Sequence, residues 1–117
     1  MKFDTLVGKT LKSVENRKDE ELIFTTTDGE VYRQFHDQMC CETVSIVDIC
    51  GDLDDLLGSP ILAAEESTNS GDCAKMEFFT WTFYHLRTFK GSVTIRWFGE
   101  SNGYYSEEVY FEQVLDG

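Results

Sequence analysis

Alternation of apolar and polar residues dominates the chain and predicts β-strands along most of its length. Two β-rich runs, residues 22–27 and 30–35, are separated by Asp28-Gly29. That dipeptide favours a type I′ turn, so the segment predicts a β-hairpin. Residues 43–49 are rich in β-branched side chains and predict a further strand.

The last third of the chain predicts a three-stranded meander, with strands at residues 78–87, 92–98 and 104–114. Side chains alternate between the two faces of a strand. The pattern therefore predicts two core-facing sets, which are Phe79, Trp81 and Phe83 on one strand and Val93, Ile95 and Trp97 on the next.

The segments between these runs are short. Residues 51–58 predict one short helix, because Asp52 stands near its start and Gly58 is placed to end it. Residues 61–66 allow a strand or a helical turn, of which the strand is favoured, and residues 67–72 have the composition of a loop. With a further strand at residues 10–15, the pattern predicts a mainly β (α+β) fold, an antiparallel sheet or partly open barrel of about seven to eight strands with one short helix.

The length and composition indicate a folded single domain over residues 1–117. The hydrophobic fraction of 41% exceeds what a disordered acidic chain carries. No apolar run resembles a signal peptide or a membrane span, so we expect a cytoplasmic protein that does not bind membranes. The four cysteines are then expected to be reduced thiols.

The negative charge is unevenly distributed. The net charge is −12, and residues 34–74 and 97–117 contain no Lys or Arg at all. Such a field repels nucleic acid phosphates and attracts basic partners, so no direct nucleic acid binding is expected. The alternative is that the acids merely keep a small protein soluble.

The acidic tracts supply the candidate partner-binding residues, which are Asp52, Asp54, Asp55, Glu65 and Glu66. The first three do not form a calcium loop, because the ligand order of an EF-hand is absent. Crowded carboxylates repel one another and have raised pKa values. The tracts therefore predict that acidification towards about pH 5, or added salt, stabilises the protein.

One cluster has metal-ligand chemistry: His36, Cys40 and Cys41, with Cys50 further along the chain. Imidazole and thiolate are the ligands that zinc prefers. No C-x-x-C pair is present, however, and neighbouring residues of a strand point to opposite faces. We therefore expect no cofactor, with zinc at His36, Cys40 and Cys41 as the alternative.

Residues 96–106 are richer in recognition chemistry than a turn requires. Arg96, Trp97, Asn102, Tyr104 and Tyr105 bring a cation, an amide and aromatic rings to one end of a predicted hairpin. This mixture suits a planar or phosphorylated small ligand such as a nucleotide. The simpler alternative is an ordinary Asn-Gly turn flanked by aromatic residues of the sheet.

Enzyme motifs are sparse. His36 and His85 are the only histidines, and no nucleophile elbow, Walker loop or H-E-x-x-H motif is present. A thiol or zinc-dependent enzyme centred on His36, Cys40 and Cys41 is the weakest of the alternatives.

Several stretches, among them Cys40-Cys41-Glu42 and Trp81-Thr82-Phe83-Tyr84, carry a family resemblance. The others are residues 3–11, 49–56, 58–61 and 95–106. Over most of its length the chain resembles a family of small, acidic, uncharacterised proteins, a domain of unknown function encoded largely by bacteriophages and prophages. The resemblance implies a phage origin and a bacterial cytoplasm, and it implies no activity.

Three functional hypotheses follow. The first is a non-enzymatic phage protein that engages a basic host protein through an acidic face, in the manner of a nucleic acid mimic. The second is a protein that binds or sequesters a small ligand such as a nucleotide. The third is the thiol or zinc-dependent enzyme.

Overall fold

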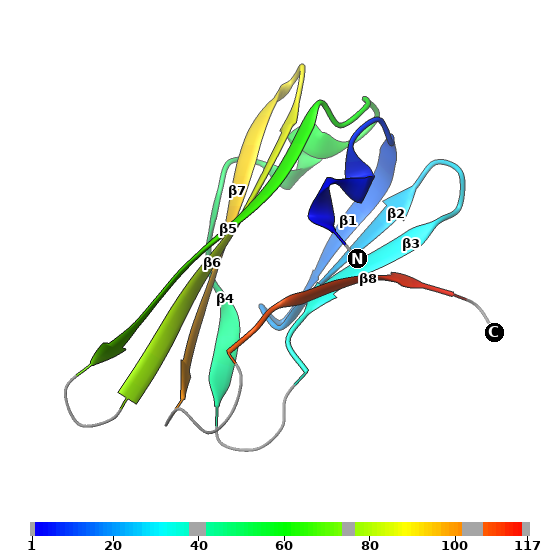
Figure 1. Cartoon of the computed structure of the whole chain (residues 1–117). Coiled ribbons are helices and arrows are strands. Elements are labelled where there is room, and N and C mark those ends of the chain that lie inside the picture. Colours follow the sequence, from blue (N-terminus) through cyan, green and yellow to red (C-terminus); the bar gives the residue numbers. More distant parts are fainter. Residues whose placement is uncertain (1, 38–41, 74–76, 102–106, 116–117) are drawn as a thin grey trace.

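Two four-stranded antiparallel sheets face each other in the computed structural model (Figure 1), which describes residues 2–37, 42–73, 77–101 and 107–115. The strand order is β1-β2-β3-β8 in the first sheet and β4-β7-β6-β5 in the second. The strands are β1 (Leu11–Arg17), β2 (Glu21–Thr26), β3 (Val31–Phe35), β4 (Thr43–Cys50), β5 (Ala63–Cys73), β6 (Glu77–Thr88), β7 (Gly91–Ser101) and β8 (Tyr110–Val114). The predicted mainly β, antiparallel fold is confirmed, and the sheets of the described residues do not close into a barrel.

The predicted hairpin is present as β2 and β3, but its turn differs from the prediction. Gly29 has a φ of 89° and its N–H donates to the carbonyl of Thr26, while the Thr26 N–H donates to the carbonyl of Glu30. This is a three-residue loop that ends in a left-handed glycine. Two consecutive positive φ values, the mark of a type I′ turn, occur instead at Lys18 and Asp19 between β1 and β2.

Side chains from both sheets form one continuous hydrophobic core. A single 3-10 turn, η1 (Phe3–Leu6), places the Phe3 ring between the sheets, with ring centroids 4.7 Å from Tyr84 and 5.1 Å from Phe111. The fully buried Trp97 of β7 donates its indole N–H to the side-chain oxygen of the fully buried Gln34 of β3, at 2.5 Å. This hydrogen bond joins the two sheets.

The aromatic residues of β6 lie on the opposite face from the one predicted. Thr82, Tyr84 and Leu86 are buried, whereas Phe79, Trp81 and Phe83 are half-buried on the outer face of the sheet. Alternation identified the two sets correctly, but both sets contain aromatic or β-branched residues, so the pattern alone did not decide which faces the core. The predicted core set Val93, Ile95 and Trp97 is confirmed, with all three side chains fully buried.

Two connecting segments also differ from the prediction. The helix expected at residues 51–58 is reduced to one 3-10 turn, η2 (Leu53–Leu56), in which the Asp52 carboxylate accepts a hydrogen bond from the N–H of Asp54. The loop expected at residues 67–72 is part of β5, where continuous pairing with β6 overrides the weak β propensity of its small polar residues.

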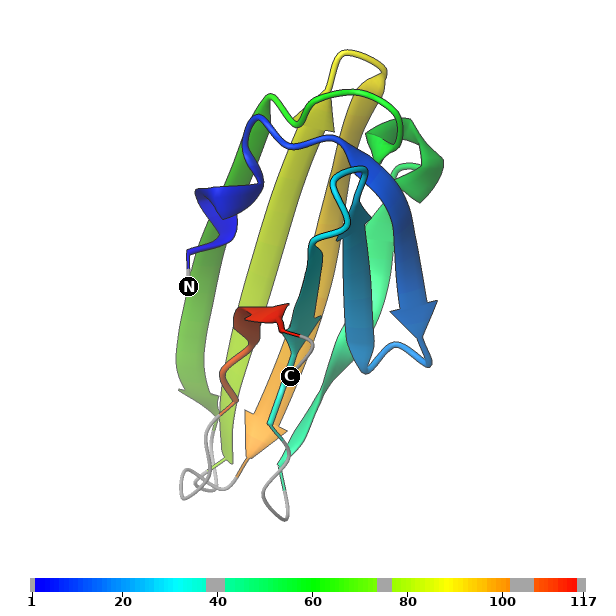
Figure 2. The same ribbon diagram turned by 90° about the vertical axis from the view of Figure 1, so that its right-hand side faces the viewer.

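The predicted meander is only partly present. β6 and β7 form the expected hairpin, but β8 pairs with β3 and therefore belongs to the other sheet. Figure 2 shows β5 at the far edge of the second sheet, with η1 beside it. None of the helical segments in the described part of the chain has the length and apolar character needed to cross a membrane.

Candidate binding surfaces

An acidic cleft opens on the inner face of β5, where the first sheet does not cover the second. It consists of two hollows that share Glu66 and Thr68. The larger, of about 460 Å³, lies between η1 and residues 64–68 of β5. The smaller, of about 260 Å³, is lined by Glu66, Thr68, Ser70, Thr80, Thr82, Glu107, Glu108 and Val109. Carboxylates and hydroxyl groups therefore converge from β5, from β6 and from the segment that precedes β8.

Hydrogen bonds hold one of these carboxylates in a fixed orientation. The Thr80 hydroxyl donates to Oε1 of Glu107 at 3.1 Å, and the Ser101 hydroxyl donates to Oε2 at 2.6 Å. Ser70 on β5 lies 3.1 Å from the Thr80 hydroxyl and extends the network across the cleft. The hydroxyl groups of Thr80 on β6 and Ser101 on β7 thus anchor the segment that leads into β8.

The electrostatics of the cleft favour an incoming positive charge. Partial burial in the cleft raises the pKa of Glu66, and the nearby carboxylate of Glu108 raises it further. The buried Tyr84, whose hydroxyl donates to the Val109 carbonyl at 3.4 Å, has a pKa raised by burial first and then by the same two carboxylates. Within the described residues Glu66 forms no ion pair. A cationic side chain in the cleft would relieve this repulsion.

The five predicted partner-binding acids do not form one surface. Glu65 and Glu66 are exposed on β5, and Glu66 lines both hollows of the acidic cleft. Asp52, Asp54 and Asp55 belong to the η2 segment, which follows β4 at the opposite edge of the sheet. Sequence reasoning missed Glu107, Glu108 and the hydroxyl groups as members of the cleft.

An aromatic cluster covers part of the outer face of the second sheet. Trp81 lies with its ring centroid 4.6 Å from Phe98 and 6.0 Å from Phe83. Arg96 stands over the Trp81 ring at 5.3 Å and pairs with the Asp48 carboxylate at 3.2 Å. These aromatic residues cover one another, so none of the three rings is fully exposed.

The predicted small-ligand site is not assembled as expected. The Arg96 side chain lies on the outer face, whereas the adjacent Trp97 is fully buried between the sheets and bonded to Gln34. A direct contact of Trp97 with a ligand is therefore incompatible with the structure, because consecutive residues of a strand point to opposite faces. The other predicted members, Asn102, Tyr104 and Tyr105, lie outside the described residues.

His36 occupies a buried polar site of its own. Its side chain is 3% exposed, and its Nε2 lies 2.9 Å from the carboxylate of the fully buried Glu42. Its Nδ1 donates to the Glu108 carbonyl at 2.6 Å. Both ring nitrogens therefore have protein partners. Cys40 and Cys41 lie outside the described residues, within which no group of three or more His, Cys, Asp or Glu side chains is arranged to hold a metal ion.

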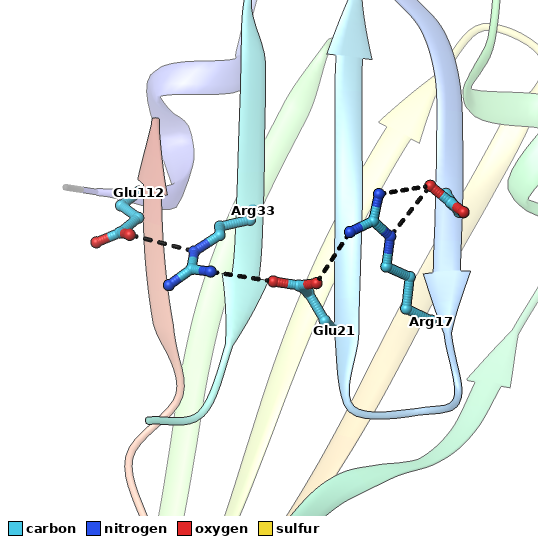
Figure 3. Close-up of polar contacts among 5 residues, drawn as sticks. Arg17, Glu21, Arg33 and Glu112 are labelled. Atoms are coloured by element: carbon cyan, nitrogen blue, oxygen red, sulfur yellow. Dashed lines mark hydrogen bonds and ion pairs between the residues drawn. The ribbon is translucent and has the colours of Figure 1, made fainter. Parts of the chain in front are cut away.

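The outer face of the first sheet carries an ion-pair network rather than a hollow (Figure 3). Arg33 lies between the carboxylates of Glu21 and Glu112, at 3.3 and 3.2 Å, and Arg17 lies between Glu21 and Glu15. Arg17 and Arg33 are thus both paired with acids of the same sheet. In the acidic cleft, by contrast, Lys2 lines the larger hollow, and the described lining of the smaller hollow contains no Lys or Arg.

The chain belongs to the family described as "Domain of unknown function (DUF7448)", whose model matches residues 4–111. The comparisons with curated proteins and with solved structures gave no match. The family description indicates no enzyme class.

Proposed function

We propose that this protein is a non-enzymatic binding protein that engages a basic protein partner through the acidic cleft. One observation carries the proposal: Glu66, Glu107 and Glu108 line the smaller hollow, where like charges repel and no Lys or Arg belongs to the described lining. A Lys or Arg of a partner would convert this repulsion into attraction. Of the predicted partner-binding acids the proposal keeps Glu65 and Glu66, and it adds Glu107 and Glu108.

The biological setting is part of the same proposal. The resemblance to phage-encoded proteins supports a phage product that acts on a host protein in the bacterial cytoplasm. The net charge of −12 supports a partner that itself carries a basic surface, such as a nucleic-acid-binding protein whose groove the acids would occupy. Direct binding of nucleic acid is not part of the proposal, because the phosphates would be repelled.

A pull-down from bacterial lysate tests the proposed function. The immobilised protein should recover a basic protein at low salt and lose it as salt rises from about 0.1 to 1 M, because the Debye length falls from about 10 to about 3 Å. E66Q should recover less of it. Asp54→Asn removes the same charge from an exposed side chain in η2 and should leave recovery nearly unchanged. Recovery of no basic protein at low salt would contradict the proposal.

A small planar ligand remains the second candidate, with its site moved to the outer face. The placement of Arg96 over Trp81 favours it, because a cation beside a half-buried aromatic ring suits a nucleotide-like ligand. A thermal-shift screen with nucleotides tests this candidate, since a true ligand raises the melting temperature by mass action. The absence of any shift would exclude it.

A further inference from the structure

The free edge of β5 is unusual among the four sheet edges of this fold. β1 and β4 each carry a register shift, between Leu11 and Ser13 and between Ile46 and Asp48, and β8 has only five residues. β5 has eleven residues and pairs with β6 in continuous register from end to end. Bulges and short strands protect sheet edges from further pairing, and β5 has neither device.

The free edge of β5 is accessible over much of its length. Residues 65–70 are all exposed, although η1 lies beside residues 64–68 across the larger hollow. Among the described residues β5 is the last strand of its sheet, with η1 beside it (Figure 2). In an antiparallel pair every second residue of an edge strand turns its N–H and C=O groups away from the sheet. These groups can accept one more strand.

We propose that an extended basic segment of the partner adds to β5 as a further strand of the sheet. This inference rests on the proposed function and specifies how the partner is held. Inward-pointing side chains of the added strand would lie beside Glu66, Thr68 and Ser70 and enter the acidic cleft. Lys or Arg at alternate positions satisfies this arrangement, because side chains alternate between faces with a period of two residues.

The outward-pointing side chains of the added strand meet different surroundings. A Cβ atom on Gly71 would lie 2.8 Å from Cζ of Phe79, so the Phe79 ring covers Gly71 and extends towards the free edge. Ser67 and Asn69, which pair with Phe83 and Trp81, are also small or polar. An apolar outward side chain at the Gly71 end would contact this ring, so the fitting segment alternates basic and apolar residues.

Charge argues for a basic partner rather than a second copy of this chain. In edge-to-edge pairing of two copies, Glu65 and Glu66 of each β5 would be brought towards the acids of the other. Like charges placed opposite each other in a sheet are destabilising. A dimer formed through β5 in solution, measured by light scattering at low salt, would therefore overturn the choice of partner.

A synthetic peptide of alternating lysine and valine tests strand addition by titration calorimetry. In one derivative the backbone nitrogens of the valines are methylated, and in the other those of the lysines. Only one of these two sets of N–H groups can face β5. We expect one derivative to lose about tenfold or more in affinity and the other to bind like the parent.

Each result of this experiment separates the two proposals. Equal affinity losses, or no loss, in both methylated peptides would overturn strand addition, while the parent's binding would still support the proposed function. Failure of the parent peptide to bind at low salt would contradict the proposed function itself. E66Q should lower the affinity for the parent peptide about three- to tenfold. D54N should leave this affinity unchanged, because Glu66 lines the cleft and Asp54 does not.

Discussion

The hydrogen bond between Trp97 and Gln34 makes the packing of the two sheets testable. Both side chains are fully buried, and the indole N–H of Trp97 is the partner of the Gln34 Oε1 atom. The Gln34 Nε2 atom has no hydrogen-bond partner among the described residues. Trp97→Phe therefore leaves both ends of a buried amide unsatisfied.

The expected cost of this substitution has two parts. Leaving a buried acceptor without its donor costs about 1–3 kcal/mol. Replacing an indole with a smaller ring adds about 1 kcal/mol for lost burial and packing. We expect Trp97→Phe to lower the free energy of unfolding by about 2–4 kcal/mol, a large part of the ~5–15 kcal/mol that stabilises a typical domain.

A double-mutant cycle isolates the hydrogen bond. Gln34→Met removes the amide while keeping a similar shape, so the Trp97→Phe and Gln34→Met double variant should be about 1–2 kcal/mol more stable than the sum of the single effects predicts. Urea unfolding followed by circular dichroism measures each variant. Additive effects within about 0.5 kcal/mol, or a cost of Trp97→Phe below that value, would refute this account of the core.

Three further predictions concern the surfaces. Gly71→Val should destabilise the protein by about 1–3 kcal/mol, since its side chain would collide with the Phe79 ring, and Gly71→Ala should cost less; thermal melting checks the order. The pKa of Glu66 is raised in the folded state, so its ionisation costs stability at neutral pH and protonation restores it. Glu66→Gln should therefore raise the melting temperature at pH 7 and reduce the stability gained on acidification towards about pH 5, and an unchanged pH profile would contradict this. Arg33→Met removes the cation between Glu21 and Glu112 and should cost only about 0.5–1.5 kcal/mol, an effect that shrinks in high salt when measured by urea unfolding.

Strands were predictable where the information is local. Alternation and turn residues identified the β2–β3 and β6–β7 hairpins, because period-two patterns and glycine turns depend on neighbouring residues. The inward set of β6 was not predictable, because Thr82, Tyr84 and Leu86 compete with an equally apolar set. Pairing with β7 and packing against the first sheet decide between them.

The candidate site was only partly predictable for the same reason. The acidic tracts pointed to Glu65 and Glu66, but Glu107 and the hydroxyl of Thr80 join them only through the tertiary fold. A local signal was available in β5, where Glu66, Thr68 and Ser70 alternate and form one polar face of a strand. Because residues 67–72 have the composition of a loop, this polar strand face was not predicted.

Mapping the contact surface by NMR is the most direct test of the acidic cleft as the binding site. The isotope-labelled protein is titrated with the alternating lysine and valine peptide at low salt, and backbone amide shifts are followed. The account predicts that the largest shifts occur in β5 at Glu66, Thr68 and Ser70, with further shifts at Thr80 and Glu107. Shifts centred on η2 or on the outer face around Trp81, with β5 unperturbed, would contradict it.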